Sequence, residues 1–168
     1  MNHFARATAL ALAAALLPAT LAAPVLAQSA TIAFDGLQQD TSQPVEVTAD
    51  SLQIAQADGA ATFTGNVLVA QGDMRMAAGQ VRVAYAAEGG RIARMHASDG
   101  VTFTAGDEAA ESREAVYDID AGTLVMTGDV VLTQGQNALS SNRLSIDLTT
   151  GTGTLEGGVR TVFQSGGN

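Results

Sequence analysis

The sequence predicts an all-β protein whose short strands form an antiparallel meander. From Val45 onward, apolar and polar residues alternate, as in Val81-Arg-Val83-Ala-Tyr85 and Leu144-Ser-Ile146-Asp-Leu148. This alternation is the signature of strands that bury one face. Residue pairs that end in glycine, such as Asp99-Gly100, lie between the apolar runs and are typical of turns. Glycine supplies the positive φ that tight hairpin turns require. No part of this region holds a helical period of 3.6 residues.

The first 27 residues have the three parts of a secretory signal peptide. Arg6 is the only charged residue among them, an apolar stretch runs from Ala7 to Leu26, and Val25-Leu26-Ala27 is a small-residue cleavage site. Cleavage after Ala27 would leave a secreted chain without cysteine, which fits a bacterial periplasm, where disulfides are permitted but not required. The alternative is a retained membrane anchor, since 20 uncharged residues are long enough to span a bilayer.

The next segment, residues 28–44, holds no sustained period and ends at Pro44. We expect a flexible lead there, with at most a short ordered turn around Ile32 to Leu37. The β domain is then expected over residues 45–163, and residues 164–168 form a C-terminal tail.

Two internal repeats organise the β domain. Thr64-Gly65-Asn66-Val67 returns 63 residues later as Thr127-Gly128-Asp129-Val130, and the positions that follow match in kind. A shorter element, small-x-x-apolar-x-apolar, begins at Ala49, Ala78, Ser112 and Ser141. Units of about 30 residues cannot bury an apolar face alone, so the copies must stack around one shared core. Either a closed barrel or an open sheet folded over itself satisfies this requirement.

The composition excludes several classes of function. The 168 residues include 17 acidic and 8 basic side chains, and the net charge of −9 opposes binding to nucleic acid. The absence of cysteine and the presence of only two histidines leave little for a metal site, a cofactor ligand set or a nucleophilic triad. We therefore expect no catalytic residues, no metal and no cofactor.

The order of the motifs resembles the OstA-like domain, a family of periplasmic lipopolysaccharide-transport proteins. The likeness covers about residues 45–162 and rests on these segments: Ala49-Asp50-Ser51-Leu52, Thr62-Phe63-Thr64-Gly65-Asn66-Val67, Gln71-Gly72-Asp73-Met74 and Thr127-Gly128-Asp129-Val130. The resemblance implies a single antiparallel sheet folded over itself, a β-jellyroll or taco. It also implies that the apolar interior holds the acyl chains of lipopolysaccharide (LPS).

The resemblance further implies partners. Copies of such domains join end to end as a homo-oligomer. The resulting bridge runs from an inner-membrane anchored OstA-like partner to an outer-membrane translocon that carries a domain of the same fold. Because uncapped terminal strands expose unpaired backbone groups, the expected edge residues are Val45, Val47, Val159 and Val162. The chain is more acidic than well-known members of the family and has no lysine, which argues against a phosphate clamp but not against burial of acyl chains.

Alternation assigns a set of side chains to the inner face of the sheet. They are Val47, Leu52, Ile54, Phe63, Val67, Val69, Met76, Val81, Val83, Tyr85, Ile92, Val101, Phe103, Tyr117, Leu124, Met126, Val130, Leu132, Leu144 and Ile146. Alternation alone is satisfied if these residues form a closed core that contacts no ligand. The family resemblance instead makes them the lining of a lipid trough.

The sequence also supports alternative interpretations of its charged residues. Arg91, Arg94 and His96 either contact lipid A phosphates or lie on a solvated strand face, and the acidic stretch from Asp107 to Asp120 fits a solvated surface better than a calcium loop.

A membrane-anchored relative of the same transport system is one alternative function. An exported β-solenoid adhesin or surface binding module is another. A glycosidase would need aromatic residues to stack on sugars, and Trp is absent.

Overall fold

The structure is a computed structural model that describes residues 29–33, 38, 40, 42–55, 59–87 and 90–162. The signal peptide predicted over residues 1–27 and the tail predicted over 164–168 lie outside the described residues. Among the residues that are described, no helix has the length and the apolar character needed to cross a membrane.

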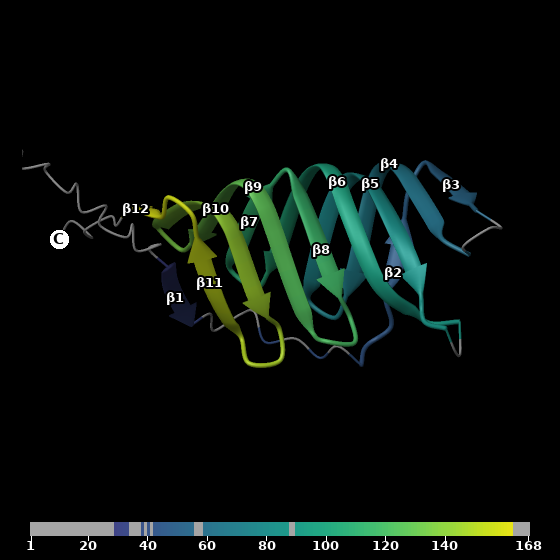
Figure 1. The fold of residues 1–168 in the computed structure, drawn as a ribbon, viewed down its shortest axis with the longest axis horizontal. Helices are drawn as coiled ribbons and strands as arrows, with labels where there is room; N and C mark the ends of the chain where they lie inside the picture. The colour runs from purple at the N-terminus through teal and green to yellow at the C-terminus, as the bar shows by residue number, and fades with distance from the viewer. Residues whose placement is uncertain are drawn as a thin grey trace, which may run out of the picture.

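All strands belong to one antiparallel sheet (Figure 1). They are β1 (Ser29–Ala33), β2 (Glu46–Thr48), β3 (Ser51–Ile54), β4 (Ala61–Gln71), β5 (Met74–Tyr85), β6 (Ile92–Ala105), β7 (Glu108–Ser112), β8 (Glu114–Asp118), β9 (Thr123–Gln134), β10 (Asn137–Asp147), β11 (Thr152–Glu156) and β12 (Arg160–Val162). From β2 to β11, the strands β2, β4, β5, β6, β7, β9, β10 and β11 are neighbours in the sheet in the order in which they occur in the chain, which confirms the predicted antiparallel meander.

The sheet folds over along one line, which we call the crease. Strands β4, β5, β6, β9 and β10 cross it with a bulge or a shift of register, whereas the pairs β2/β3, β7/β8 and β11/β12 are single bent strands interrupted there. The part of each bent strand on the β2, β7 and β12 side forms layer one. The part on the β3, β8 and β11 side forms layer two, which β1 joins at its end. The sheet is therefore folded over itself, as the family resemblance implies.

Glycine makes the crease possible. Gly65 and Gly128 have φ of +82° and +84°, and the residues after them, Asn66 and Asp129, are also left-handed. The backbone N–H of Asp50 donates to the carbonyl oxygen of Gly65 at 2.9 Å, so the ladder continues across the bend. The repeat seen at an offset of 63 residues is thus the recurrence of one crease element, and β-bulges of this kind bend a strand.

Two pairs that the sequence assigns to turns, Asp99-Gly100 and Gly157-Gly158, lie at the crease instead. Asp99-Gly100 does not connect two strands but lies inside β6, where it forms the crease. Positive φ at such a pair serves a bulge as well as a hairpin, so local sequence does not separate the two. The tight turns that follow β4 and β9 contain Gly72 and Gly135, whose φ values are +54° and +58°.

Adding a side chain at the crease should destabilise the fold. In Gly128→Ala, the new Cβ would lie 3.0 Å from the side chain of Arg113, and the residue would keep φ near +84°. We expect the free energy of unfolding to fall by about 2–3 kcal/mol, because strain and a steric clash add. The matched control is Gly135→Ala, with φ of +58° and no atom within 4 Å of the new Cβ; it should cost about 1 kcal/mol. Urea denaturation measures both, and equal losses would contradict a steric role for the crease.

The structure differs from the sequence-based expectation at the start of the described chain. Ser29–Ala33, expected within a flexible lead, form strand β1 and pair antiparallel with β11 at the far end of the domain. Ile32 is the only large apolar side chain among these five residues, so the alternation is weak, and the partner strand is more than 100 residues away in sequence. Sequence periodicity detects neither feature, since edge strands are fixed by tertiary pairing.

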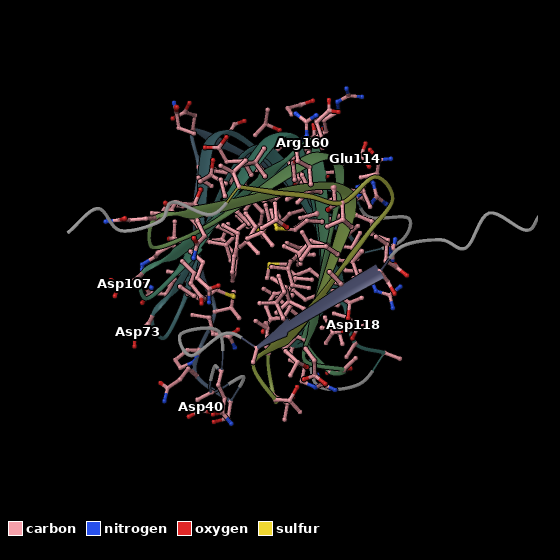
Figure 2. All side chains as sticks on the ribbon, turned by 90° about the vertical axis from the view of Figure 1, so that its left-hand side faces the viewer. Asp40, Asp73, Asp107, Glu114, Asp118 and Arg160 are labelled. Carbon is pink, nitrogen blue, oxygen red and sulfur yellow. The ribbon has the colours of Figure 1, made fainter. Side chains whose placement is uncertain are left out.

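Apolar side chains fill the space between the two layers. Seen along the long axis in Figure 2, carbon-rich side chains crowd the interior, while labelled charged residues such as Asp73, Asp107 and Glu114 lie at the periphery. Phe103, Met126 and many others on the inner face are at most 2% exposed. In this structure the interior is a packed core over most of its length.

Candidate functional site

The inner face of the sheet is the candidate site, and strand register defines it. Directly opposed residues of an antiparallel pair share one face. In layer two, one such row runs through every strand from β3 to β11: Leu52, Phe63, Val81, Ala97, Ala115, Met126, Leu144 and Leu155. The apolar inner face therefore extends from one end of the domain to the other.

Most of the side chains predicted to face inward are buried. The buried ones are Val67, Val69, Met76, Val81, Val83, Val101, Phe103, Tyr117, Leu124, Met126, Val130, Leu132, Leu144 and Ile146. Val47, Phe63 and Ile92 are half-buried and pack against this core. The alternation of the sequence thus places these residues on the inner face, whereas their proposed contact with lipid is a separate matter.

Three predicted inward residues are exposed. Leu52 and Ile54 are 53% and 65% exposed because β3 is the edge strand at one end of layer two. The register nevertheless keeps both residues on the inner face. Tyr85 is 44% exposed and ends β5 at the side of the molecule opposite the crease, where the two layers are not joined by strands. We call this side the open side.

Sequence reasoning missed several inner-face residues. Met95, Leu139, Leu148 and Leu155 are at most 5% exposed, as are several alanines. Met95, Leu139 and Leu155 were missed because turns, crease bulges or charged neighbours interrupt the alternation around them. Leu148 continues the alternating run of β10, but it lies one residue beyond the end of that strand. Glu108 was also misassigned: it is only 6% exposed, not a solvated acidic residue, and its Oε1 accepts a hydrogen bond from Gln134 Nε2 at 2.9 Å.

A cavity of about 570 Å³ opens between the layers on the open side. Such a volume falls in the range of ligand pockets, roughly 300–1,000 Å³. Its lining is largely apolar and comes from the segment before β2 and from the strand ends and turns near β5, β6 and β8; it includes Pro44, Val45, Tyr85, Ile92 and Ile119. Only Tyr85 and Ile92 of these belong to the predicted trough. Ile119 was missed because it stands between Asp118 and Asp120 at a turn.

Gln71 ties the two layers together beside this cavity. The hydroxyl of Tyr117, in layer two, donates to Gln71 Oε1, in layer one, at 2.6 Å. Gln71 Nε2 in turn donates to the carbonyl oxygen of Gln43 at 2.8 Å. Burial raises the pKa of Tyr117 to about 12, so its hydroxyl stays a donor at neutral pH. Counting by two from Val67 and Val69 puts Gln71 on the inner face, and this is the signal by which the sequence could have revealed it.

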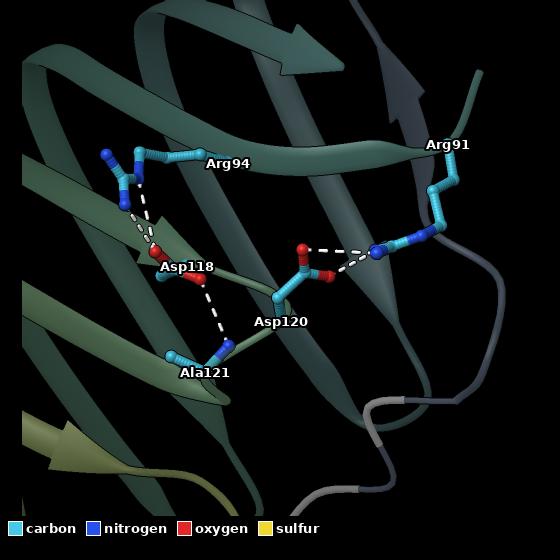
Figure 3. A network of polar contacts seen from close by, with 5 residues as sticks. All are labelled: Arg91, Arg94, Asp118, Asp120 and Ala121. Atoms are coloured by element: carbon cyan, nitrogen blue, oxygen red, sulfur yellow. Dashed lines mark hydrogen bonds and ion pairs between the residues drawn. The ribbon is translucent and has the colours of Figure 1, made fainter. Parts of the chain in front are cut away.

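The arginine cluster is compensated by carboxylates (Figure 3). Arg91 pairs with Asp120, and Arg94 Nη2 donates to Asp118 Oδ2 at 2.5 Å. The hydrogen bond from Arg94 lowers the pKa of Asp118, and the bond with Asp120 raises the pKa of Arg91. Since both guanidinium groups already have anionic partners, the structure favours a solvated face over a phosphate clamp.

The four predicted edge residues lie in different settings. Val47, in β2, is half-buried on the inner face, and Val45 and Val159 also pack against the core. Val162, in β12, is 54% exposed. Strands β2 and β12 end layer one at opposite ends of the molecule (Figure 1), so these residues lie near its two ends.

Comparisons with known proteins agree with this geometry. Residues 46–152 match the family described as LptA/(LptD N-terminal domain) LPS transport protein. An uncharacterised protein of Rhizobium meliloti (strain 1021) is 34% identical over an alignment of 155 residues, and the alignment covers 87% of this chain and 83% of that protein. The crystal structure of LptH from Pseudomonas aeruginosa, described as the LptA homologous periplasmic component of the lipopolysaccharide transport device, is similar in fold. Its TM-score is 0.67 at 16% identity, over 76% of this chain and 99% of LptH.

The family match covers more than half of the chain, and it coincides with the crease elements and the apolar inner face described above. The chain belongs to the LptA/(LptD N-terminal domain) family of LPS transport proteins.

Proposed function

We propose that this protein is a periplasmic LPS-binding bridge component that carries LPS from the inner to the outer membrane. The observation that carries the proposal is the inner face, whose apolar rows run from β3 at one end to β11 at the other. Membership in the LPS transport family supports the substrate class. The signal peptide expected over residues 1–27 supports a periplasmic location.

Burial of acyl chains supplies the binding energy in this proposal. Transfer of one methylene from water is worth about 0.8 kcal/mol, so a twelve-carbon chain gains at most on the order of 8–10 kcal/mol. Because the interior is packed, acyl chains must first occupy the open-side cavity near Tyr85 and Ile92 and then separate the layers. Similar apolar rows at successive strands allow neighbouring positions to bind about equally, so that transport needs no covalent chemistry.

End-to-end contact with other domains of the same fold completes the proposal. The first bent strand, β2/β3, and the last, β11/β12, lie at opposite ends of the molecule (Figure 1). Pairing the first strand of one copy with the last strand of another continues the sheet and the apolar inner face. The same edges suit an inner-membrane anchored partner and an outer-membrane translocon domain, since a head-to-tail interface can repeat.

Native mass spectrometry tests the proposal. The protein exported to an LPS-producing periplasm should retain adducts of the mass of LPS or lipid A, and it should form oligomers that increase with protein concentration. The same protein purified from a strain depleted of LPS is the control, and it should bind LPS when the lipid is added. A bare protein that stays unchanged after addition of LPS would contradict LPS carriage.

A further inference from the structure

Strand β1 departs from the plan of the rest of the sheet. In the described part of the chain, the strands that contribute to both layers are, in order, β2/β3, β4, β5, β6, β7/β8, β9, β10 and β11/β12. Strand β1 joins layer two alone, where it pairs with β11 from Ser29↔Glu156 to Ala33↔Thr152. It therefore covers the outer edge of β11 but leaves the adjoining edge of β12 without a strand among the described residues (Figure 1).

Strand direction shows what the uncovered edge is suited to accept. Neighbouring bent strands alternate in direction, so the first of the eight, β2/β3, runs antiparallel to the eighth, β11/β12. A second copy can therefore place β2/β3 beside β11/β12 and continue an antiparallel sheet in both layers. Strand β1 already runs antiparallel to β11, in the direction that an incoming β3 would take.

The crease repeats in the same alternating way. Each bent strand contributes one of two kinds of crease element, and the two kinds alternate from strand to strand. One kind is a single residue: Asp50, Gly79, Arg113 or Asn142. The other kind is a pair of residues that opposes it: Gly65-Asn66, Asp99-Gly100, Gly128-Asp129 or Gly157-Gly158. The last bent strand ends this series with the pair Gly157-Gly158. A single-residue element is due next, and β2/β3 begins the series with one, Asp50.

The sequence of β1 is similar to that of β3. Ser29-Ala-Thr-Ile-Ala33 aligns with Ser51-Leu-Gln-Ile-Ala55, with serine, isoleucine and alanine identical. The register is also equivalent: Ser29 opposes the residue before Gly157, and Ser51 opposes the residue before Gly65. The two strands differ in burial, because Ile32 packs against the core whereas Ile54 is 65% exposed.

We propose that β1 occupies, within one copy, the place that β3 of a second copy takes on assembly. The proposal rests on the end-to-end assembly proposed above and adds that β1 must leave β11 for both layers to join. The exchange replaces one antiparallel ladder by another, and Leu52 fills the inner-face position that Ala30 vacates. Because β1 is tethered to its own domain, it competes at a high effective concentration. Assembly therefore starts only when the concentration of the second copy is sufficient.

A reversible covalent lock on β1 tests this proposal. Thr31 and Thr154 are directly opposed, a geometry in which paired cysteines can form a disulfide, and the chain has no cysteine of its own. Oxidised Thr31→Cys/Thr154→Cys should remain monomeric at concentrations at which its reduced form and the wild-type chain form oligomers in analytical ultracentrifugation. We expect the lock to raise the concentration needed for assembly at least tenfold.

A second pair reports the exchange itself. If β3 replaces β1 in the same register, Gln53 of one copy opposes Thr154 of the next. Gln53→Cys/Thr154→Cys should then give a ladder of disulfide-linked oligomers, whereas Gln53→Cys alone, the matched control, should give none. A second β1 variant, Ile32→Asp, should weaken the docking of β1 and lower the concentration needed for assembly. Its control is Thr31→Asp, which faces outward on the same strand.

Each outcome is decisive. Equal assembly of the oxidised and the reduced Thr31→Cys/Thr154→Cys protein would overturn the exchange and leave end-to-end assembly intact. If neither the wild-type chain, the reduced protein nor Ile32→Asp assembles at any concentration, end-to-end assembly itself fails, and the exchange fails with it. A monomeric wild-type chain alongside an assembling Ile32→Asp variant would support the exchange directly.

Discussion

Phe103→Ala should lower the free energy of unfolding by about 3–5 kcal/mol, the range for removing a large aromatic side chain from a closed core. Phe103 lies on β6, opposed by Met76 and Ala110 on the neighbouring strands, and is 1% exposed. Because the Phe103 side chain lies between the two layers, the loss of unfolding free energy shows how tightly the layers pack against each other. Urea denaturation followed by circular dichroism measures it.

Thr102→Ala is the matched control, because Thr102 is adjacent to Phe103 but exposed on the outer face. Its effect should stay within about 0.5 kcal/mol. A loss below 1 kcal/mol for Phe103→Ala would mean that the interior is an open trough in the lipid-free protein and that Phe103 contacts solvent there. The measurement thus separates a packed resting state from a preformed channel.

Ile92→Asp should weaken binding of LPS at least tenfold while the protein stays folded. Ile92 is half-buried at the open-side cavity, where an acyl chain is proposed to enter. A carboxylate there must be desolvated whenever an acyl chain occupies the cavity, and a tenfold change in affinity requires only about 1.4 kcal/mol. Titration of the variant with fluorescent LPS, together with thermal unfolding, measures both properties.

Val131→Asp is the matched control for Ile92→Asp. Val131 is, like Ile92, a β-branched apolar residue in a strand. It is 41% exposed, but it lies on the outer face of β9. Both variants add the same charge, so repulsion between the acidic protein and anionic LPS is matched. Equal losses of affinity in the two variants would remove the open-side cavity from the binding site.

The choice of residues for testing lipid binding depends on their burial in the tertiary structure. The inward pattern alone suggests Val67→Asp and Phe103→Asp as tests of lipid binding. Both side chains are 1% exposed, and a buried carboxylate without a partner destabilises the whole domain. Such variants would lose LPS binding through unfolding, and for this reason the half-buried Ile92 is the sharper choice.

The candidate site was predictable to the extent that it is periodic. Val81, Val83, Leu144 and Ile146 alternate cleanly with polar residues and are buried. Ile119 and Gln71 were missed as cavity or bridging residues, because one stands between two aspartates and the other is polar. Gln71 bonds to Tyr117 of layer two and to Gln43, and Ile119 lines the cavity together with the segment before β2. All of these partners lie far away in the chain.

The sequence by itself determined the all-β class, the meander order and the inner face, because these depend on alternation and on turn residues that act between neighbours in the chain. It also determined the repeat that became the crease. Only the tertiary structure decided that Asp99-Gly100 bends a strand, that the interior is packed, and that β1 covers β11. These features depend on pairing between segments distant in sequence, where the free energy comes from contacts that no local pattern encodes.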